Sequence, residues 1–407
     1  MKLTEIINFN PATRLSKGAN LPFIDMATLP TFGREIPSFE IREFNGSGSK
    51  FQNGNTLLAR ITPCLENGKG GMVRELPGDG TGYGSTEFIV MRARREADST
   101  FVYYLSRLPD FRNFSIHQMT GTSGRQRVAW QSLQNFEIAE LSCNERGDIA
   151  SLLGSLDDKI ALNRRMNETL QGMARALFRD WFVDFGPTRA KMNGTRPYLA
   201  PDLWALFPDR LDSNTGLPSG WRVGTLGTCF HLVMGQSPPG HTYNDQEEGI
   251  PFFQGRTDFG FRYPKTRKFC SAPTRIAEHG DTLVSVRAPV GDINMAWETC
   301  CVGRGLAALR HISGSQSFTY YSALSLQQDL RQYEHSGTVF GSISKKQFEA
   351  LGVLEPTPKL VNAFENQVAA FDERIKKNIS ENRTLAQTRD LLLPKLMSGT
   401  IRLTPAA

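Results

Sequence analysis

The chain has 407 residues, of which 39% are hydrophobic and 22% charged, and its net charge is +6 at pH 7. This composition excludes a disordered chain, and the length predicts two or three domains. The start does not resemble a signal peptide, no apolar run is long enough to span a membrane, and the six cysteines form no C-x-x-C pair. We therefore expect a cytoplasmic protein with reduced thiols and no metal site, whose mild basicity permits a nucleic-acid partner.

The first expected domain covers residues 1–142. Within it, "STEFIVMRAR" (85–94) alternates like a half-buried strand, and "STFVYYLSRLPDFRNFS" (99–115) is typical of helix. Short strands, Gly/Pro turns and an occasional helix predict an α+β domain, with little sign of a doubly wound sheet.

A long helix is predicted next, over 143–185. Apolar residues and two asparagines recur there in alternating steps of four and three, which is the seam of a coiled coil. The seam positions are Ile149, Leu153, Leu156, Ile160, Asn163, Asn167, Leu170, Ala174, Leu177 and Trp181.

The second half of the chain repeats this plan. A Pro- and Gly-rich connector (186–220) leads to a second α+β domain (221–356), and a second helix follows (357–400). Adding 215 to each seam position gives Phe364, Val368, Phe371, Ile375, Asn378, Asn382, Leu385, Arg389, Leu392 and Leu396. The asparagines of the second seam match asparagines of the first, whereas Arg389 is a polar residue that matches an apolar one, Ala174.

The matched asparagines indicate that the two helices pair with each other. A buried polar residue at a seam position weakens a coiled coil but specifies its register. Antiparallel pairing would join Asn163 to Asn382 and Asn167 to Asn378, yet parallel pairing would also bring asparagines together, so the seam leaves the direction open. The expected helix-pairing residues are Ile160, Asn163, Asn167, Leu170, Ile375, Asn378, Asn382 and Leu385.

Two glycine-rich loops at matching positions are candidates for DNA contact. Glycine lets the backbone approach a phosphate, and Arg or Gln can hydrogen-bond to a base edge. In "GTSGRQR" (121–127) the candidates are Thr122, Ser123, Arg125, Gln126 and Arg127. In "GTVFGSISKK" (337–346) they are Ser342, Ser344, Lys345 and Lys346. The alternatives are a solvated loop in the first case and a helix cap in the second.

Two further groups of basic residues are candidates. In "QGRTDFGFRYPKTRK" (254–268) basic residues alternate with aromatic residues, which predicts a strand with one basic face. The candidates in this segment are Gln254, Arg256, Arg262 and Lys265. Arg60 and Arg287 end the similar segments "NGNTLLARITP" and "HGDTLVSVRAP", which suggests a shared role. Core aromatics under a solvated edge, and arginines paired to local carboxylates, are the alternatives.

Sequence signatures of catalysis are lacking. There is no P-loop, no G-x-S-x-G and no H-E-x-x-H. "NFNPAT" (8–13) contains the Asn-Pro of a DNA methyltransferase tetrad but lacks its second proline and aromatic residue. We therefore expect a binding protein without catalytic or metal-binding residues.

The chain resembles the DNA-specificity subunit of a type I restriction-modification system over essentially its whole length. The resemblance is carried by the order and duplication of individually degenerate motifs. In the first half these are "KGANLPFIDMATLP" (17–30) and "LFRDWFVDFGPTRAKMNG" (177–194). In the second half they are "MGQSPPGHTYNDQEEGIPFFQG" (234–255), "VRAPVGDINMAWETCCVGRGLAAL" (286–309), "PTPKLVNAFENQVAAFDERI" (356–375) and "LLPKLMSGTIRL" (392–403).

The resemblance implies two target-recognition domains, each reading one half of a bipartite sequence in double-stranded DNA. It also implies that the two helices form an antiparallel coiled coil with pseudo-two-fold symmetry and bind two methyltransferase subunits, while restriction/translocase subunits join the complex. S-adenosylmethionine, ATP and Mg would belong to those partners, and this chain would hold no cofactor. A seam of 33 residues spans roughly 50 Å. One turn of DNA is about 34–36 Å, so this length suits half-sites separated by about one to one and a half turns.

Two other functions stay open at this point. One is a protein-interaction scaffold built on the helix pair, which steep salt dependence of binding would argue against. The other is a self-contained methyltransferase, which the missing motifs argue against.

Overall fold

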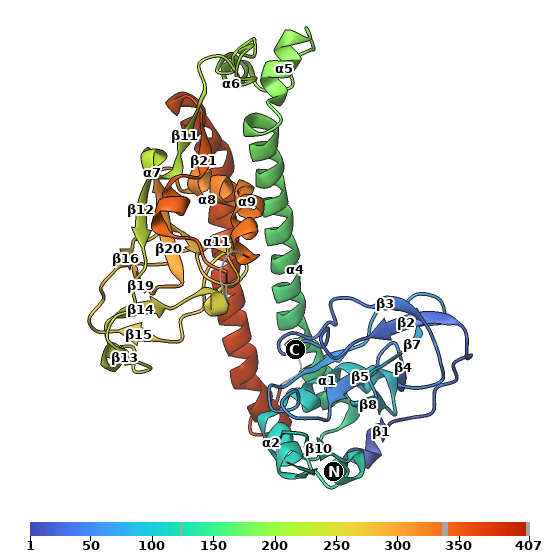
Figure 1. Cartoon of the computed structure of the whole chain (residues 1–407). Helices are drawn as coiled ribbons and strands as arrows, with labels where there is room; N and C mark the ends of the chain where they lie inside the picture. Colours follow the sequence, from blue (N-terminus) through green and yellow to red (C-terminus); the bar gives the residue numbers. More distant parts are fainter. Residues whose placement is uncertain (123, 336–340, 404–407) are drawn as a thin grey trace. The chain divides into compact units, whose positions relative to one another are not determined.

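The structure is a computed structural model that describes residues 1–122, 124–335 and 341–403. It has an α+β fold in which each of two mixed domains is followed by a 40-residue helix (Figure 1). By its contacts the chain divides into two compact units, Met1–Met166 with Lys377–Ala407, and Asn167–Lys376. Each unit therefore contains one domain and a part of both long helices.

The domain of unit 1 contains two four-stranded sheets and a short hairpin. The first sheet has the order β1-β8-β5-β6 and is antiparallel throughout. In the second, of order β3-β2-β7-β4, only β2 and β7 are parallel. Pairing of β9 with β10 forms the hairpin. The strands are β1 Ile7–Phe9, β2 Asn20–Ile24, β3 Glu40–Glu43, β4 Ser49–Gln52, β5 Thr56–Ala59, β6 Gly70–Met72, β7 Thr81–Gly84, β8 Phe88–Ala93, β9 Met119–Thr120 and β10 Arg127–Val128.

Strand β8 is buried on both faces, so the half-buried strand expected for 85–94 is wrong. Phe88 and Val90 belong to one hydrophobic cluster, whereas Ile89 and Met91 belong to the other. The strand alternates between two cores rather than between core and water. β17 (Thr282–Ser285) in unit 2 is likewise buried at every position.

The helix predicted over 99–115 forms as two helices, α1 (Ser99–Arg107) and α2 (Pro109–His117). Pro109 begins the second helix because proline has no amide hydrogen to donate and is tolerated in a first turn. Buried aromatic residues of α1 join the larger core of unit 1. A short helix, α3 (Trp130–Leu133), follows the hairpin.

Unit 2 repeats the sheet topology of unit 1. Its sheet β12-β20-β17-β18 is antiparallel, as is β1-β8-β5-β6. Its second sheet has the order β13-β15-β14-β19-β16, in which only β14 and β19 are parallel, so the last four strands match β3-β2-β7-β4 and β13 is added at one edge. The strands β11 and β21 form a separate antiparallel pair. The strands are β11 Arg222–Thr225, β12 Phe230–Met234, β13 Tyr243–Asn244, β14 Ile250–Phe253, β15 Phe269–Cys270, β16 Ile276–Ala277, β17 Thr282–Ser285, β18 Ile293–Met295, β19 Cys300–Val302, β20 Leu306–His311 and β21 Gly352–Glu355. Its short helices are α7 Leu226–Cys229, α8 Gln316–Ser325, α9 Gln327–Arg331 and α10 Lys345–Glu349. The duplication inferred from sequence thus extends to strand order and direction.

The strand predicted within 254–268 is wrong. After β14 the chain forms a single 3-10 turn, Arg256–Asp258, and then runs without regular structure to β15. Burial does not alternate either, because Arg262 and Tyr263 are both buried while Phe261 is exposed. The segment follows local contacts rather than a sheet, so its basic residues do not share one face.

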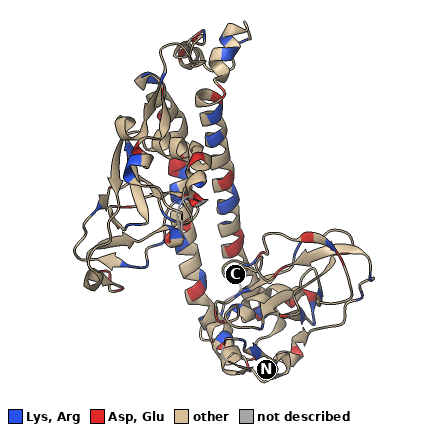
Figure 2. Cartoon of the chain, in the orientation of Figure 1, with Lys and Arg blue, Asp and Glu red and all other residues tan. Residues whose placement is uncertain are grey.

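The two long helices are α4 (Cys143–Phe182) and α11 (Pro358–Met397). All the seam positions predicted on both helices are buried or half-buried. Acidic and basic residues are interleaved along each helix (Figure 2). The hydrophobic seam is therefore the face through which each helix packs.

Within each unit the contacts between the helices are antiparallel. In unit 1, Asn163 bonds Asn382, and Asp157 bonds Arg389. In unit 2, Gln171 of α4 and Asp372 of α11 bond the same side chain, that of Arg262, and further along α4 the ring of Phe178 lies 5.5 Å from that of Phe364, centroid to centroid. Paired residue numbers fall on one helix as they rise on the other, which is the direction that the resemblance implied.

The connector between the halves contains two short helices, α5 (Gly186–Met192) and α6 (Pro201–Ala205). It is attached to the end of α4 by Phe207, whose ring lies edge-on to Trp181 at 5.1 Å.

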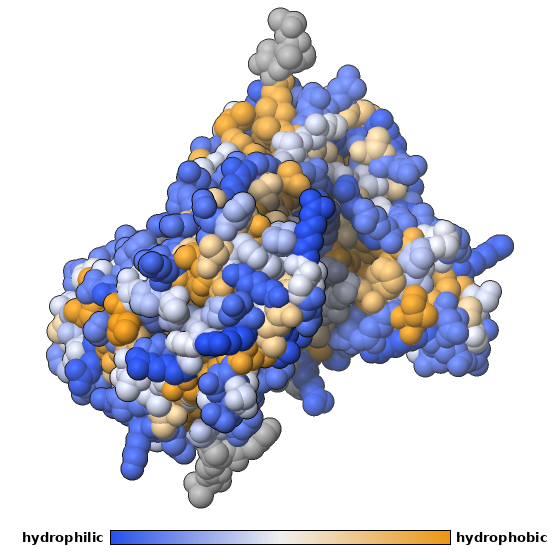
Figure 3. All heavy atoms as spheres, turned by 90° about the horizontal axis from the view of Figure 1, so that it is seen from above, coloured by the Kyte–Doolittle hydropathy of each residue, from blue (hydrophilic) through white to orange (hydrophobic). Residues whose placement is uncertain are grey.

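Hydrophilic residues cover most of the face seen in Figure 3, with hydrophobic residues in smaller groups. No helix in the described part of the chain is long and apolar enough to cross a membrane.

Candidate nucleic-acid interface

In unit 1 the glycine-rich loop and the end of β5 are joined by backbone hydrogen bonds. The amide of Val128 donates to the carbonyl of Arg60 (2.9 Å), and that of Thr62 donates to Gln126 (3.0 Å). Gln126 in turn donates its amide to the Thr62 hydroxyl, 3.1 Å away. The structure thus brings three sequence candidates, Arg60, Gln126 and Arg127, to one junction.

Arg127 and Arg125 have different environments at this junction. The Nε of Arg127 donates to both carboxylate oxygens of Glu87, at 2.8 and 3.0 Å, and these hydrogen bonds raise the pKa of Arg127. Arg125 is exposed, and in the described residues it has no ion pair. Arg127 is therefore held to the domain, while Arg125 is available to a ligand. Thr122 is exposed beside it, and Ser123 lies outside the described residues.

Unit 2 has the same junction at the end of β17. The amide of Ile343 donates to the carbonyl of Val286 (3.1 Å), and that of Ala288 donates to Gly341 (2.9 Å). Arg287 and Ser342 form an isolated bridge, as Ile61 and Arg127 do in unit 1. Both Arg287 and Ser342 are exposed.

These matching bonds correct the pairing of Arg60 with Arg287. In the bonding pattern Arg60 corresponds to Val286, and Arg287 corresponds to Ile61, one residue later. Because successive residues of an extended segment point to opposite sides, the shared role expected for the two arginines is wrong. The half-buried Arg60 has an Nε atom without a partner in the described residues, whereas Arg287 faces solvent.

Ser344 is a helix cap, the alternative that the sequence left open. Its hydroxyl accepts a 3.3 Å hydrogen bond from the amide of Gln347, and the Gln347 side chain accepts from the amide of Ser344 at 3.0 Å. This capping box begins α10. Lys345 pairs with Glu349 one turn later, and Lys346 is exposed at the same helix start. Ser344 therefore organises the loop instead of offering its hydroxyl to DNA.

Arg262 is the clearest correction among the candidates. Its side chain is 0% exposed, because its guanidinium is enclosed by α4, α8 and α11. A side chain without solvent access cannot contact a phosphate, so its assignment to DNA binding is wrong. The charge is instead satisfied internally, as a buried charge must be.

The other candidates of 254–268 are engaged by neighbours or lie apart. Gln254 exchanges hydrogen bonds with Ser237. Arg256 pairs with Asp292, whose amide bonds the hydroxyl of Ser285 at the end of β17. This connection places Arg256 near the unit 2 junction, while Lys265 is exposed further along the loop.

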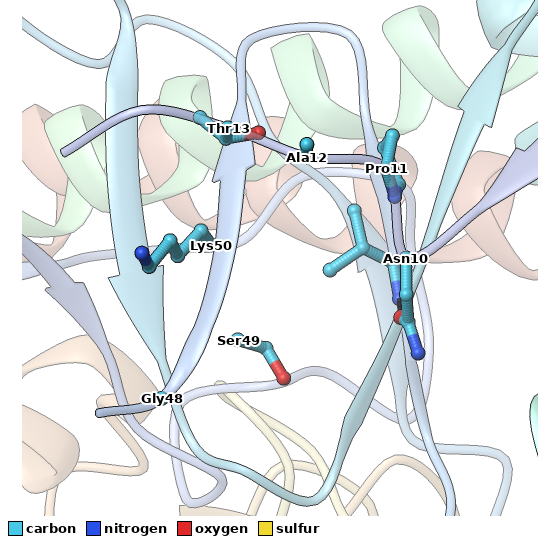
Figure 4. A pocket seen from close by; sticks show the side chains of 8 residues that line it. Asn10, Pro11, Ala12, Thr13, Gly48, Ser49 and Lys50 are labelled. Atoms are coloured by element: carbon cyan, nitrogen blue, oxygen red, sulfur yellow. Dashed lines mark hydrogen bonds between the residues drawn. The ribbon is translucent and has the colours of Figure 1, made fainter. Parts of the chain in front are cut away.

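A pocket of about 340 Å³ lies between the segments Asn10–Thr13 and Gly48–Lys50 (Figure 4). The Asn-Pro noted in the sequence lines it, but the Asn10 side chain accepts a 2.8 Å hydrogen bond from the amide of Val90. The Ser49 hydroxyl donates to the carbonyl of Phe88. These polar groups thus complete the sheet rather than face a ligand. In the described ranges no three His, Cys, Asp or Glu residues are placed to hold a metal ion.

The residues that sequence reasoning missed are Glu87 and Thr62. Glu87 receives the Arg127 side chain and, through its carbonyl, the amide of Arg60. Thr62 anchors the loop at Gln126. Glu87 lies within the segment 85–94 that was expected to be a strand and just before the observed strand β8, and its nearness to the loop followed only from sheet topology.

The predicted helix-pairing residues all lie on the inner faces of the helices. Ile160, Asn163, Asn167, Ile375 and Asn378 are buried, and Leu170, Asn382 and Leu385 are half-buried. Asn163 meets Asn382 as antiparallel pairing predicts. The pairing of Asn167 with Asn378 stays a prediction.

Comparison with known proteins finds the same kind of relative repeatedly. The chain is 26% identical over 327 residues to a Methanocaldococcus jannaschii protein described as the MjaX specificity subunit of a type I restriction enzyme, covering 79% of this chain and 72% of that one. It is 25% identical over 336 residues to the HindI specificity subunit of Haemophilus influenzae, covering 68% and 71%. No family model matches the chain.

A crystal structure of the type I restriction-modification system S subunit from M. genitalium has a similar fold. The TM-score is 0.58 over 98% of this chain and 95% of that one, at 16% identity. The likeness extends along two tandem domains and both long helices. The curated relatives are type I specificity subunits, so the resemblance drawn from the sequence is confirmed.

Proposed function

We propose that this chain is the sequence-specific DNA-binding subunit of a type I restriction-modification complex and directs that complex to a bipartite site. The observation that carries the proposal is the duplicated junction, in which the same backbone hydrogen bonds join a loop to a strand end in each domain. A protein with two equivalent junctions suits a target with two half-sites.

In unit 1 the reading residues we propose are Arg125 and Gln126, with Arg127 held by Glu87 as the support of the loop. In unit 2 they are Arg287, Ser342 and Lys346. All of these side chains are exposed or half-buried. Arg and Gln can bond base edges in the major groove, and Lys can neutralise phosphates.

The partners proposed are two methyltransferase subunits and restriction/translocase subunits, together in the cytoplasm. The chemistry is assigned to those subunits, which would bind S-adenosylmethionine, ATP and Mg, and this chain would act without a cofactor. The support for this division is that its curated relatives are named as specificity subunits. Acidic and basic residues along the solvent faces of α4 and α11 offer a surface for such partners (Figure 2).

The test is selection from random duplex DNA with the chain co-purified with a type I methyltransferase subunit. We expect enrichment of a split motif with one fixed gap. The matched control is the methyltransferase purified without this chain, which should enrich no motif.

Failure to enrich any motif, with the complex intact by size-exclusion chromatography, would refute the proposal. A single continuous motif would refute the assignment of one half-site to each domain.

A further inference from the structure

Arg262 joins the domain of unit 2 to three helices at once. Its Nη1 donates to Asp372 of α11 (2.9 Å), its Nε to Gln171 of α4 (3.1 Å), and its Nη2 to the hydroxyl of Tyr321 on α8 (2.9 Å). The guanidinium also stacks on the ring of Tyr320, 3.9 Å from its centroid. Each of the three guanidinium nitrogens therefore donates to an acceptor on a different helix, which fixes the orientation of the planar group.

Burial of this charge is costly compared with an apolar residue of similar volume. A buried ion pair is thus weak evidence for stabilisation, so the presence of a buried arginine at this position needs another explanation. The planar fork of arginine gives direction, since each N–H must point at its own acceptor. Arg262 lies on an irregular loop, which by itself would set no fixed angle between domain and helices.

Unit 1 contains a counterpart built from different partners. Arg34, 4% exposed, pairs with Asp158 of α4. The neighbouring residues Tyr103 and Tyr104 lie within α1, as Tyr320 and Tyr321 lie within α8. Their hydroxyls donate to the carbonyl of Gly33 (2.8 Å) and to Asp157 (2.7 Å).

Gly154 of α4 leaves room for the end of the Arg34 side chain in unit 1. A Cβ atom at that position would lie 3.1 Å from Nη1 of Arg34. Each domain is thus attached through a buried arginine and a tyrosine pair to the long helix that follows it in the chain, α4 for unit 1 and α11 for unit 2.

We propose that Arg262 and Arg34 are positioning residues that fix the orientation of each recognition domain on the helices, and thereby the single gap between half-sites that the complex accepts. The inference rests on the proposed function. Neither arginine touches DNA, so their loss should change the gap and leave the half-site sequences unchanged.

The experiment repeats the DNA selection with Arg262→Met and Arg262→Lys in the complex with its methyltransferase. Arg262→Met should spread the selected sites over gaps one base pair shorter and longer than that of the wild type, with both half-sites retained. Arg262→Lys keeps the charge but offers no planar fork, so it should also loosen the gap. The control is Arg222→Met, which removes an exposed arginine paired with Glu355 and should keep the wild-type gap.

A folded Arg262→Met complex that selects only the wild-type gap would overturn the inference. If the Arg262→Met chain melts below the selection temperature, the gaps selected by Arg262→Lys and Tyr321→Phe are compared with the wild-type gap instead. Folded complexes of both that select only the wild-type gap would overturn the inference. Tyr321→Phe removes the acceptor of Nη2 and the hydrogen bond that the same hydroxyl donates to Asp372, and it leaves Arg262 itself in place. A wild-type chain that enriches no split site would overturn the proposed function, and this inference with it, whereas a wild-type gap in every variant would overturn this inference alone.

Discussion

Asn163 on α4 donates from Nδ2 to the Oδ1 of Asn382 on α11 at 3.0 Å, and from the same nitrogen to Glu381 at 2.8 Å. The carbonyl oxygen of Asn163 is buried and has no partner in the described residues. This amide therefore specifies which residue of α11 faces it, while one of its own polar atoms lies unsatisfied in the seam.

Substitution of both asparagines, Asn163→Leu with Asn382→Leu, should keep or raise the melting temperature. Replacing both partners of a buried hydrogen bond by apolar groups is often neutral, and here an unsatisfied oxygen is removed as well. The register should loosen because a leucine seam accepts neighbouring registers. Thermal melting and a cysteine crosslinking map of the two helices measure the two effects, and a large fall in melting temperature would contradict the prediction.

Arg389, the one unmatched polar residue of the seam, bonds Asp157, which also accepts from Tyr104. Asp157 is 4% and Arg389 13% exposed. Arg389→Met should cost about 3–5 kcal/mol, because it leaves the buried carboxylate without its counter-charge. Urea unfolding measures the loss, and Arg389→Met with Asp157→Leu should recover part of it.

The control for this prediction is Arg179→Met on the same helix pair. Arg179 pairs with Asp184, but both side chains are more than half exposed, so little or no change is expected. An equal loss for both arginines would show that burial does not decide the cost.

The seam and the duplication could be predicted because both are periodic patterns in one dimension. Heptad spacing needs only the positions of residues such as Ile160 and Ile375, which are buried as expected. The seam pattern could not give the direction of pairing, because Asn163 would meet an asparagine in either orientation. The three-dimensional structure was needed to decide it.

The binding residues were predicted less well because burial of a charge depends on contacts distant in sequence. From sequence, Arg262 was one of several basic residues on a predicted strand, yet its partners Gln171 and Asp372 lie 91 and 110 residues away. Arg127 was found, but its partner Glu87 was not, because sheet pairing brings the two together. Ser344 could be placed either way, since a capping serine and a DNA-binding serine have the same sequence context.

Stability should fall in mild acid because of His311. Its ring lies between Phe230 and Phe318, and burial there lowers the pKa of His311 below its ordinary value of 6.5, against a weaker opposite effect of Glu355. As the pH falls, the unfolded chain takes up a proton at His311 more readily than the folded chain does, which favours unfolding. The contribution of neutral His311 to the free energy of unfolding is therefore fully present above pH 6.5 and is lost as the pH falls through the lower pKa of the folded state.

Melting temperatures of the wild type and of His311→Phe, measured from about pH 8 to about pH 5, test this assignment. Phenylalanine keeps a ring between the two aromatic neighbours but cannot titrate. The variant should lose less stability than the wild type over this range, and equal losses would exclude His311 as the cause.

Deletion of one heptad from both helices should shorten the gap in the recognised DNA. Removal of residues 162–168 and 377–383 brings Leu170 into the seam position of Asn163, so the apolar spacing continues. Seven residues correspond to about 10 Å of helix, or about three base pairs of duplex. Selection from random DNA measures the gap.

Deletion from one helix alone is the control for this experiment. It shifts one seam against the other and should prevent a stable complex. A double deletion that folds and keeps the original gap would exclude the helices as the element that sets the spacing.

Arg125→Ala should weaken DNA binding and lower the salt dependence of the affinity. Arg125 is exposed in the loop of unit 1, and its guanidinium has no ion pair in the described residues. Loss of one phosphate contact lowers the slope of log affinity against log salt by about one, whereas loss of a base contact relaxes one position of the half-site read by unit 1 and leaves the other half-site unchanged. Arg210→Ala, an equal loss of charge at an exposed site of the connector, is the control. If both variants change the slope equally, net charge alone is responsible, and Arg125 has no specific contact.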